Sequence, residues 1–245
     1  MNPLELSPIA YISSCYKEKF GIPRQPGLVR SAKSRLIMDQ LFTEECVRGL
    51  DGFSHIWLQF IFHGTQSQGW KPMVRPPRLG GNKKVGVFAS RSTFRPNPIG
   101  LSVVELEKIE ITESNVVLHL LGCDLLDGTP VLDIKPYLPY VDSILEAMSG
   151  FATDAPQKVI SVSFSRESEI QCKQAADRLG EDVKKLVTEI LQYDPRPSYQ
   201  QGARNKELEN ERVYAMKLHD FDLRWEYSEH NKINILSLST INDQG

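Results

Sequence analysis

The sequence predicts a mainly β protein, a sheet or barrel followed by a smaller α+β part. Up to about residue 150, short segments rich in β-branched and aromatic residues are separated by loops rich in Gly and Pro. This pattern is typical of sheets and barrels rather than of alternating strands and helices. Beyond a small and polar linker, a long amphipathic segment precedes three further strand-like segments. We therefore predict a β domain over 1–150 and a small α+β domain over 157–245.

Six segments of the first part are expected to be strands, and 54–62 shows the reason most clearly. It is dominated by aromatic and β-branched residues, which suit a buried strand, and it carries His55 and His63 at its ends. Their even spacing places both on one face but about 26 Å apart, too far to share a metal. Thr43 is expected to cap a helix over 43–50. The expected strands are 9–12, 54–62, 85–88, 101–111, 115–121 and 131–134.

The second part begins with an expected strand at 159–164. Apolar residues then recur every three to five positions over 167–192, which fits one amphipathic helix, or two with a break at Gly180. The following sequence Asp194-Pro195-Arg196-Pro197 must leave the helix because its prolines lack amide protons. The last three segments, 213–218, 221–225 and 233–238, are expected to form a meander.

Composition excludes several classes of protein. The 245 residues are 40% hydrophobic and 24% charged, as in an ordinary chain that buries a sizeable core. No apolar run approaches the roughly 20 residues of a membrane-spanning helix, and the first residues do not resemble a secretory signal. We expect a cytoplasmic protein with no membrane partner. The four cysteines are scattered and are expected to be reduced and mostly buried, no ligand cluster predicts a metal, and glycine-rich nucleotide fingerprints are missing.

The formal net charge of −2 conceals a strong segregation of charge. The windows 17–35 and 64–104 hold 13 of the 29 basic residues and one of the 31 acidic residues, a net charge of +12, so the remainder carries −14. If the two windows lie side by side, their positive field attracts a polyanion such as nucleic acid. The alternative, solvated basic loops paired with acids elsewhere, fits the charges alone equally well.

Two polar segments are candidates for a site. In the segment 91–100, prolines hold Arg91, Arg95 and Asn97 at low conformational cost, as a binding loop requires. The alternative is a rigid loop whose arginines brace neighbouring carbonyl groups. Asp133 and Lys135 share one face of an extended segment, where a carboxylate and an ammonium can orient a polar substrate or move a proton. The alternative there is a plain salt bridge.

Eight motifs together carry a resemblance that extends over both parts of the chain. They are Lys17-Glu18-Lys19-Phe20, Pro23-Arg24-Gln25-Pro26-Gly27, Phe53-Ser54-His55, Gly86-Val87-Phe88-Ala89-Ser90-Arg91-Ser92, Arg95-Pro96-Asn97-Pro98-Ile99-Gly100, Asp127-Gly128-Thr129-Pro130, Asp133-Ile134-Lys135-Pro136-Tyr137 and Asp194-Pro195-Arg196-Pro197. With these motifs the chain closely resembles the TsaA/YaeB-like family, the TrmO tRNA methyltransferases. The stretch 86–100 is the most specific part of the match.

The resemblance implies a β-barrel methyltransferase that uses S-adenosylmethionine and needs no metal. The implied reaction is methylation of N6 of threonylcarbamoyladenosine at position 37 of tRNA, next to the anticodon, by a homodimer. Asp133 would accept the N6 proton, while Lys135 and Tyr137 orient the modified base. The implied cofactor-binding residues are Gln25, Pro26, Gly27, His63, Gly64, Arg91, Leu101, Asp127, Gly128, Thr129 and Pro130. The implied tRNA-binding residues are Arg95, Asn97, Asp194 and Arg196, the last two from the C-terminal domain.

One rival interpretation comes from another class of protein. It is a non-catalytic RNA-binding module whose basic loops hold tRNA and whose cofactor pocket is vestigial. A small-molecule hydrolase is disfavoured because the sequence has neither a G-x-S-x-G nucleophile elbow nor a metal cluster. Binding of S-adenosylmethionine would best separate these interpretations.

Overall fold

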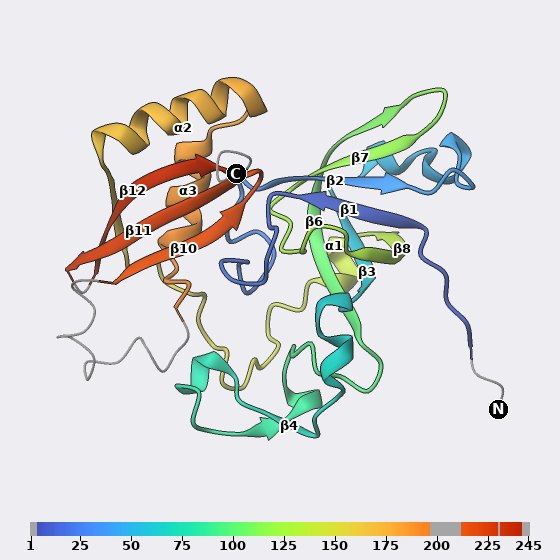
Figure 1. Ribbon diagram of the computed structural model, residues 1–245. Coiled ribbons are helices and arrows are strands. Elements are labelled where there is room, and N and C mark those ends of the chain that lie inside the picture. Colours follow the sequence, from blue (N-terminus) through green and yellow to red (C-terminus); the bar gives the residue numbers. More distant parts are fainter. Residues whose placement is uncertain (1–3, 197–211, 230, 242–245) are drawn as a thin grey trace.

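The first part of the chain forms a closed barrel of six strands (Figure 1). The computed structural model describes residues 4–196, 212–229 and 231–241. Around the barrel the strand order is β1-β2-β7-β6-β3-β8, and neighbouring strands are antiparallel. The strands are β1 (Ala10–Ser14), β2 (Lys33–Met38), β3 (His55–Ile61), β6 (Ile99–Ile111), β7 (Val116–Leu121) and β8 (Pro130–Pro136). The predicted mainly β fold is therefore confirmed.

Alternation along the strands separates the inside of the barrel from its outer face. In β3, Ile56, Leu58 and Phe60 are buried, whereas Trp57 and Gln59 between them are only partly buried. The buried side chains join those of the other strands in one hydrophobic core. The period-two pattern of the sequence therefore decides which side chains face outward, where a ligand can reach them.

A long excursion of the chain between β3 and β6 extends away from the barrel (Figure 1). It contains the two-stranded sheet of β4 (Met73–Val74) and β5 (Val85–Gly86). Three short 3₁₀ helices, His63–Gln68, Pro77–Leu79 and Val87–Ala89, complete the excursion. Much of the basic window 64–104 therefore lies on loops that the barrel carries.

The second part of the chain is a four-stranded sheet with two helices packed against it (Figure 1). The strand order is β10-β11-β12-β9, and β9 is parallel to β12 while the other pairs are antiparallel. Gly180 adopts a φ of 70° and ends the first helix, so the alternative with two helices is correct. The elements are β9 (Ser161–Phe164), α2 (Arg166–Leu179), α3 (Val183–Leu191), β10 (Val213–Leu218), β11 (Phe221–Glu229) and β12 (Lys232–Thr240).

The segment after β1 joins the barrel to the second part. Cys15 and Tyr16 are buried in the hydrophobic core of the C-terminal sheet and helices. Tyr16 also forms a β-bridge with Leu218 at the edge strand β10, and Phe20 stacks on Trp225 with 6.0 Å between ring centroids. The C-terminal core is therefore built partly from N-terminal residues.

The helix expected over 43–50 is wrong. The chain instead forms two 3₁₀ helices, Glu44–Val47 and Leu50–Gly52. Gly49 between them has a φ of 82°, which interrupts any continuous helix, and the hydroxyl of Thr43 makes no capping hydrogen bond.

Two expectations about strands also need correction. β5 has only two residues because the chain turns into a 3₁₀ helix at Val87, so the strand expected over 85–88 is too long. β3 ends at Ile61, and His63 begins the following 3₁₀ helix. His55 and His63 therefore do not share a strand face.

The four cysteines are free, as expected, and Cys46 is the exposed one. Burial raises the pKa of the Cys123 thiol to about 12, which keeps it protonated and unreactive. Across the part of the chain that the structure describes, no helix is long and apolar enough to cross a membrane.

Candidate functional site

A cavity of about 280 Å³ lies where one end of the barrel meets two loops. Its walls come from the loop 19–26, the end of β3 with the residues that follow it, the loop around Arg91, the start of β6, and the turn before β8. Phe60, Leu101 and Leu125 supply apolar surface, while Lys19, Arg24, Arg91, Ser102 and Asp124 supply polar groups. Both basic windows thus contribute to one cavity, and the Arg91 guanidinium donates a hydrogen bond to Oε1 of Gln25.

Two glycines allow the walls of this cavity to come together. The Gly27 amide donates to the Gly122 carbonyl oxygen at 2.8 Å. Gly122 has a φ of 66°, and a Cβ atom there would lie 3.1 Å from the Cα atom of Gly27. A side chain at Gly122 would push the loop 23–27 away from the barrel, so this close backbone approach sets the width of the cavity.

Seven of the predicted cofactor-binding residues line this cavity. They are Gln25, Pro26, His63, Gly64, Arg91, Leu101 and Thr129. Gly27, Asp127, Gly128 and Pro130 lie beside it and support its walls instead. Asp127 pairs with Lys17 at 2.8 Å and accepts the Ser14 amide at 2.9 Å, and the Gly128 amide donates to the Ile12 carbonyl. These contacts fix the turn before β8 against β1.

Asp124 is a cavity residue that the sequence analysis missed. Its Oδ1 accepts the Ser102 hydroxyl at 2.9 Å, and both residues line the cavity. Burial raises the pKa of the Asp124 carboxyl to about 6, although the Ser102 hydrogen bond and the charge of Arg91 act in the opposite direction. The only sequence signal is a single acidic residue in the otherwise apolar stretch after β7, which is too common to identify a site.

The three predicted catalytic residues lie on the outer face of the barrel, beside the cavity. Asp133 and Lys135 form an ion pair on β8, and the Tyr137 ring contacts Trp57 with 5.9 Å between ring centroids. In the sheet register, Gln59 pairs with Asp133 on one side and with Leu101 on the other. Because adjacent strands are about 4.8 Å apart, Asp133 lies about 10 Å from the cavity wall at Leu101.

Arg95 braces the loop 91–100 by binding neighbouring carbonyl groups, which is one of the two interpretations of this loop. The Arg95 guanidinium donates to the carbonyl oxygens of Ser90 at 2.9 Å and Val87 at 3.3 Å, and it lies 5.7 Å from the Phe88 ring centroid. Asn97 remains exposed, and Phe88 is 77% exposed. The bracing holds these two side chains outward on the surface, where they are free to meet a ligand.

Arg196, which the resemblance implies in tRNA binding, is 1% exposed. Its Nε and Nη2 atoms each donate to Asp194 at 2.8 Å, and its guanidinium stacks 3.9 Å from the Tyr227 ring centroid. The Tyr227 hydroxyl donates to the same carboxylate at 3.0 Å. Burial lowers the pKa of Arg24, a residue of the cavity wall, and the charge of Asp194 acts on it in the opposite direction.

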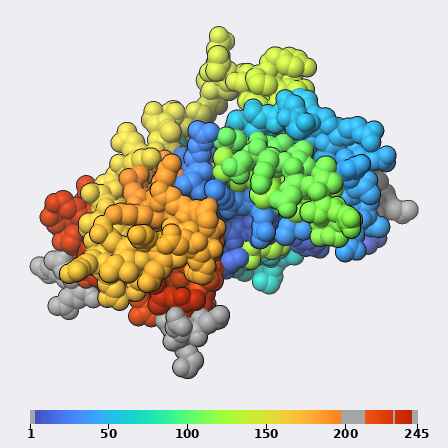
Figure 2. Space-filling view, turned by 90° about the horizontal axis from the view of Figure 1, so that it is seen from above, coloured from blue at the N-terminus to red at the C-terminus, as the bar shows by residue number. Residues whose placement is uncertain are grey.

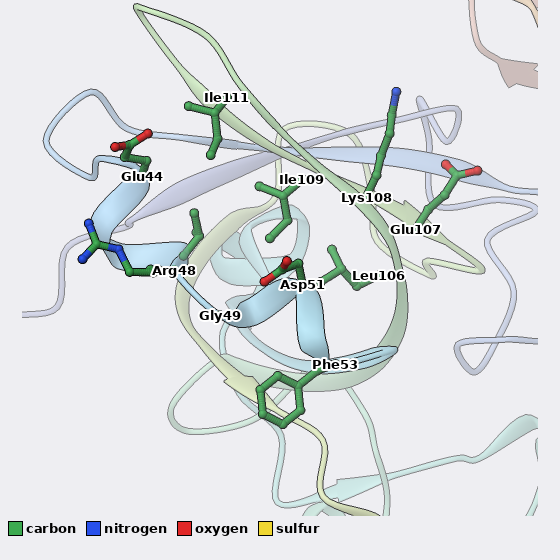
Figure 3. Close-up of a pocket in the computed structure, with 11 residues that line it drawn as sticks. Glu44, Arg48, Gly49, Asp51, Phe53, Leu106, Glu107, Lys108, Ile109 and Ile111 are labelled. Carbon is green, nitrogen blue, oxygen red and sulfur yellow. The ribbon is translucent and has the colours of Figure 1, made fainter.

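A second, larger cavity of about 590 Å³ lies between the 3₁₀ helices at 44–52 and the far half of β6. Figure 3 shows Glu107 and Lys108 on the opposite side of it from Glu44 and Arg48, so its charged groups do not converge. None of the predicted site residues lines it. In the described ranges, no group of three potential metal ligands occurs at either cavity.

The closed barrel carries a cavity of mixed polarity at its mouth, and basic loops border this cavity. These features define a class of barrel enzymes that bind a charged cofactor without having a doubly wound fold. Within that class the chain belongs to the TrmO family. The tRNA-methyltransferase O N-terminal domain matches residues 11–143, and the TrmO C-terminal domain matches residues 157–241.

Relatives from bacteria and from humans support this assignment. The tRNA (adenine(37)-N6)-methyltransferase of Escherichia coli strain K12 is 46% identical over 230 residues, which is 94% of this chain and 95% of the relative. The human protein of the same name is 42% identical over 150 residues, 59% of this chain and 33% of its own length. A crystal structure of TrmO from Pseudomonas aeruginosa, at 38% identity, matches with a TM-score of 0.79 and covers 97% of this chain and all of that one.

We expect Arg196→Ala to lower the free energy of unfolding by about 3–5 kcal/mol, because it removes the bidentate partner of a buried carboxylate. The matched control is Arg178→Ala, since Arg178 pairs with Asp220 at the surface and should contribute less than about 1 kcal/mol. Urea denaturation of both variants measures the difference. An unchanged stability combined with a raised KM for tRNA would show that Arg196 contacts the RNA after all.

Proposed function

We propose that this protein transfers a methyl group from S-adenosylmethionine to N6 of the adenine at position 37 of tRNA, with threonylcarbamoyladenosine as the form of that nucleotide it accepts. The observation that carries the proposal is the cavity at the barrel mouth, which joins both basic windows next to the face with Asp133, Lys135 and Tyr137. A tRNA substrate supports a location in the cytoplasm.

The cavity fits the cofactor in charge and polarity. S-adenosylmethionine has a carboxylate, two positively charged centres and an adenosine. Lys19, Arg24 and Arg91 offer positive charge to the carboxylate, and Asp124 offers negative charge to a positive centre. Phe60, Leu101 and Leu125 offer the apolar surface that a purine and the methylene groups require.

Methyl transfer mainly requires that the donor and the acceptor nitrogen are held in line, because the donor is already activated. When bound, S-adenosylmethionine supplies a methyl group on a positively charged sulfur, which keeps the electron pair of the broken C–S bond. The N6 lone pair forms the new N–C bond, and N6 must lose its proton. Asp133 accepts that proton, and Lys135 holds the carboxylate in place through their ion pair.

The basic excursion 63–98 binds the tRNA. Lys83 and Lys84 are exposed on it, and so are the aromatic rings of Phe88 and Trp70. Exposed lysines neutralise phosphates, and exposed rings stack on unpaired bases such as those of an anticodon loop. The C-terminal domain assists by supporting the cavity wall through the pair of Asp194 and Arg196 beside Arg24.

The functional unit is a homodimer formed through an apolar arm, which we define as residues 139–151. The arm contains α1 (Pro139–Asp142) and stands away from the body of the molecule (Figure 2). Tyr140 is 84% exposed, Leu145 95% and Met148 98%, and so dense an apolar patch is unusual on a monomer. Asp142 anchors the arm by accepting the Trp57 indole N–H at 2.9 Å. A second copy seated on the arm therefore lies next to the face with Asp133.

The proposed acceptor is tested with matched tRNAs that carry or lack the threonylcarbamoyl group. The urea-like group makes the N6 proton more acidic and gives Lys135 and Tyr137 more to hold, so we expect the modified tRNA to be methylated much faster. Asp133→Asn should lower the single-turnover rate roughly 100-fold while the affinities for cofactor and tRNA change little. Equal rates on both tRNAs contradict the acceptor, and normal turnover of Asp133→Asn excludes Asp133 as the base.

The proposed RNA surface is tested by reversing Lys83 and Lys84 to Glu. Each lysine that neutralises a phosphate contributes about 1 to the slope of log affinity against log salt, so both the affinity and the slope should fall. The matched control reverses Arg48 and Lys108, two basic residues at the larger cavity. Filter binding at several salt concentrations measures both variants. If they bind tRNA equally, the Lys83 and Lys84 pair lies outside the RNA surface.

The proposed dimer is tested by Leu145→Glu combined with Met148→Glu. Two charges in a buried apolar interface are costly, so we expect a concentration-dependent shift from dimer to monomer in analytical ultracentrifugation. Leu41→Glu is the control, because Leu41 is also 84% exposed but lies outside the arm. A wild type that sediments as a monomer, or a double variant that stays dimeric, contradicts the role of the arm.

A further inference from the structure

The cavity has one acidic group among several basic ones. In the described residues of its lining, Lys19, Arg24 and Arg91 are basic, and Asp124 is the single carboxylate. S-adenosylmethionine carries two positive centres, the ammonium of its amino acid part and the sulfur that holds the methyl group. The Asp124 carboxylate can therefore interact with either the ammonium or the positively charged sulfur.

The Asp124 carboxylate is oriented but incompletely compensated. Ser102 donates to its Oδ1 atom, the Asp124 backbone amide also stabilises the carboxylate, and within the described ranges no other side chain donates a hydrogen bond to it. The charge of Arg91 acts on it from the neighbouring loop, and the buried Cys123 and Tyr16 lie close by. Burial still outweighs these stabilising contacts and raises its pKa. A positively charged ligand supplies the missing interaction.

The position of Asp124 favours the sulfur over the ammonium. Ser102 follows Leu101 in β6. The Ser102 side chain is buried, whereas Leu101 faces outward and is linked through Gln59 to Asp133 on the acceptor face. A methyl donor bound at this end of the cavity would therefore lie one strand residue from the side that leads to the acceptor. An ammonium also needs three hydrogen-bond acceptors, whereas the walls beside Asp124 are the apolar Leu101 and Leu125.

We propose that Asp124 binds the positively charged sulfur of S-adenosylmethionine and thereby distinguishes the cofactor from S-adenosylhomocysteine, whose sulfur is neutral. This assignment rests on the proposed function. Transfer of the methyl group removes the charge that Asp124 attracts, while the ammonium and carboxylate of the product remain unchanged. Asp124 therefore makes the cavity prefer fresh cofactor to spent product and hastens exchange between turnovers.

The test compares two affinities in one variant. Asp124→Asn keeps the shape and the acceptor for Ser102 but removes the charge, and isothermal titration calorimetry measures both ligands with the full-length protein. We expect the Kd for S-adenosylmethionine to rise roughly 10- to 100-fold and the Kd for S-adenosylhomocysteine to change less than about threefold. Glu110→Gln is the control, because it removes one exposed carboxylate of β6 that does not line the cavity.

A pH series adds an independent readout. Protonation of Asp124, with its pKa near 6, removes the attraction, so wild-type affinity for S-adenosylmethionine should fall between pH 7 and pH 5. The same pH series on Asp124→Asn shows the pH dependence that other groups of the cavity contribute. The part of the pH dependence that disappears in the variant belongs to Asp124.

The outcomes separate this assignment from the proposed function. An equal loss of affinity for both ligands would overturn the proposal, because it would show that Asp124 binds the ammonium or only supports the structure. Unchanged affinities for both ligands would also overturn it. A wild type that binds neither ligand would overturn the proposed function itself. Thermal melting checks folding, and if Asp124→Asn does not fold, Ser102→Ala decides: it must weaken S-adenosylmethionine more than S-adenosylhomocysteine.

Discussion

The segment from Cys15 to Ala32 is the constraint on which the site depends, because both parts of the molecule hold it. Tyr16, Val29 and Ala32 are buried in the C-terminal core, while the Gly27 amide is bonded to Gly122 next to the barrel. The loop between these anchors supplies one wall of the cavity. A change in how the C-terminal sheet packs would therefore move cavity residues directly.

The charged residues form two distinct surfaces, the basic excursion and the cavity. The basic excursion projects from the barrel and acts at long range on a polyanion, where ionic strength screens it. The charges inside the cavity are fewer, and the Asp124 carboxyl among them is desolvated and therefore less screened than the exposed Lys19, Arg24 and Arg91. One chain can thus attract tRNA through its loops while its near-neutral total avoids the behaviour of a general polycation.

Sequence patterns predicted the features that depend on the local conformation of the chain, namely strands and helix ends. Alternating and β-branched residues predicted most of the strands, although not β2, and Gly180 predicted the break between two helices through its own backbone conformation. The missed features depend on tertiary packing. Asp124 is unremarkable until Ser102 and the cavity walls surround it, and Arg196 resembles a surface arginine until Tyr227 and Asp194 enclose it. Ser102 is 22 residues from Asp124, and Tyr227 is 33 residues from Asp194. No rule of sequence spacing could pair residues so far apart.

The difference between Asp124 and Asp133 follows from what surrounds each carboxylate. Asp133 is paired with Lys135 and half-exposed, whereas Asp124 is desolvated and bonded to a neutral hydroxyl. A desolvated carboxylate attracts a nearby positive charge more strongly than a hydrated one. A carboxylate beside the acceptor must instead remain free to take a proton and return it to water. If both proposals hold, two acidic residues on adjoining sides of one barrel wall act at opposite ends of the transferred methyl group, one toward the donor and one toward the nucleophile.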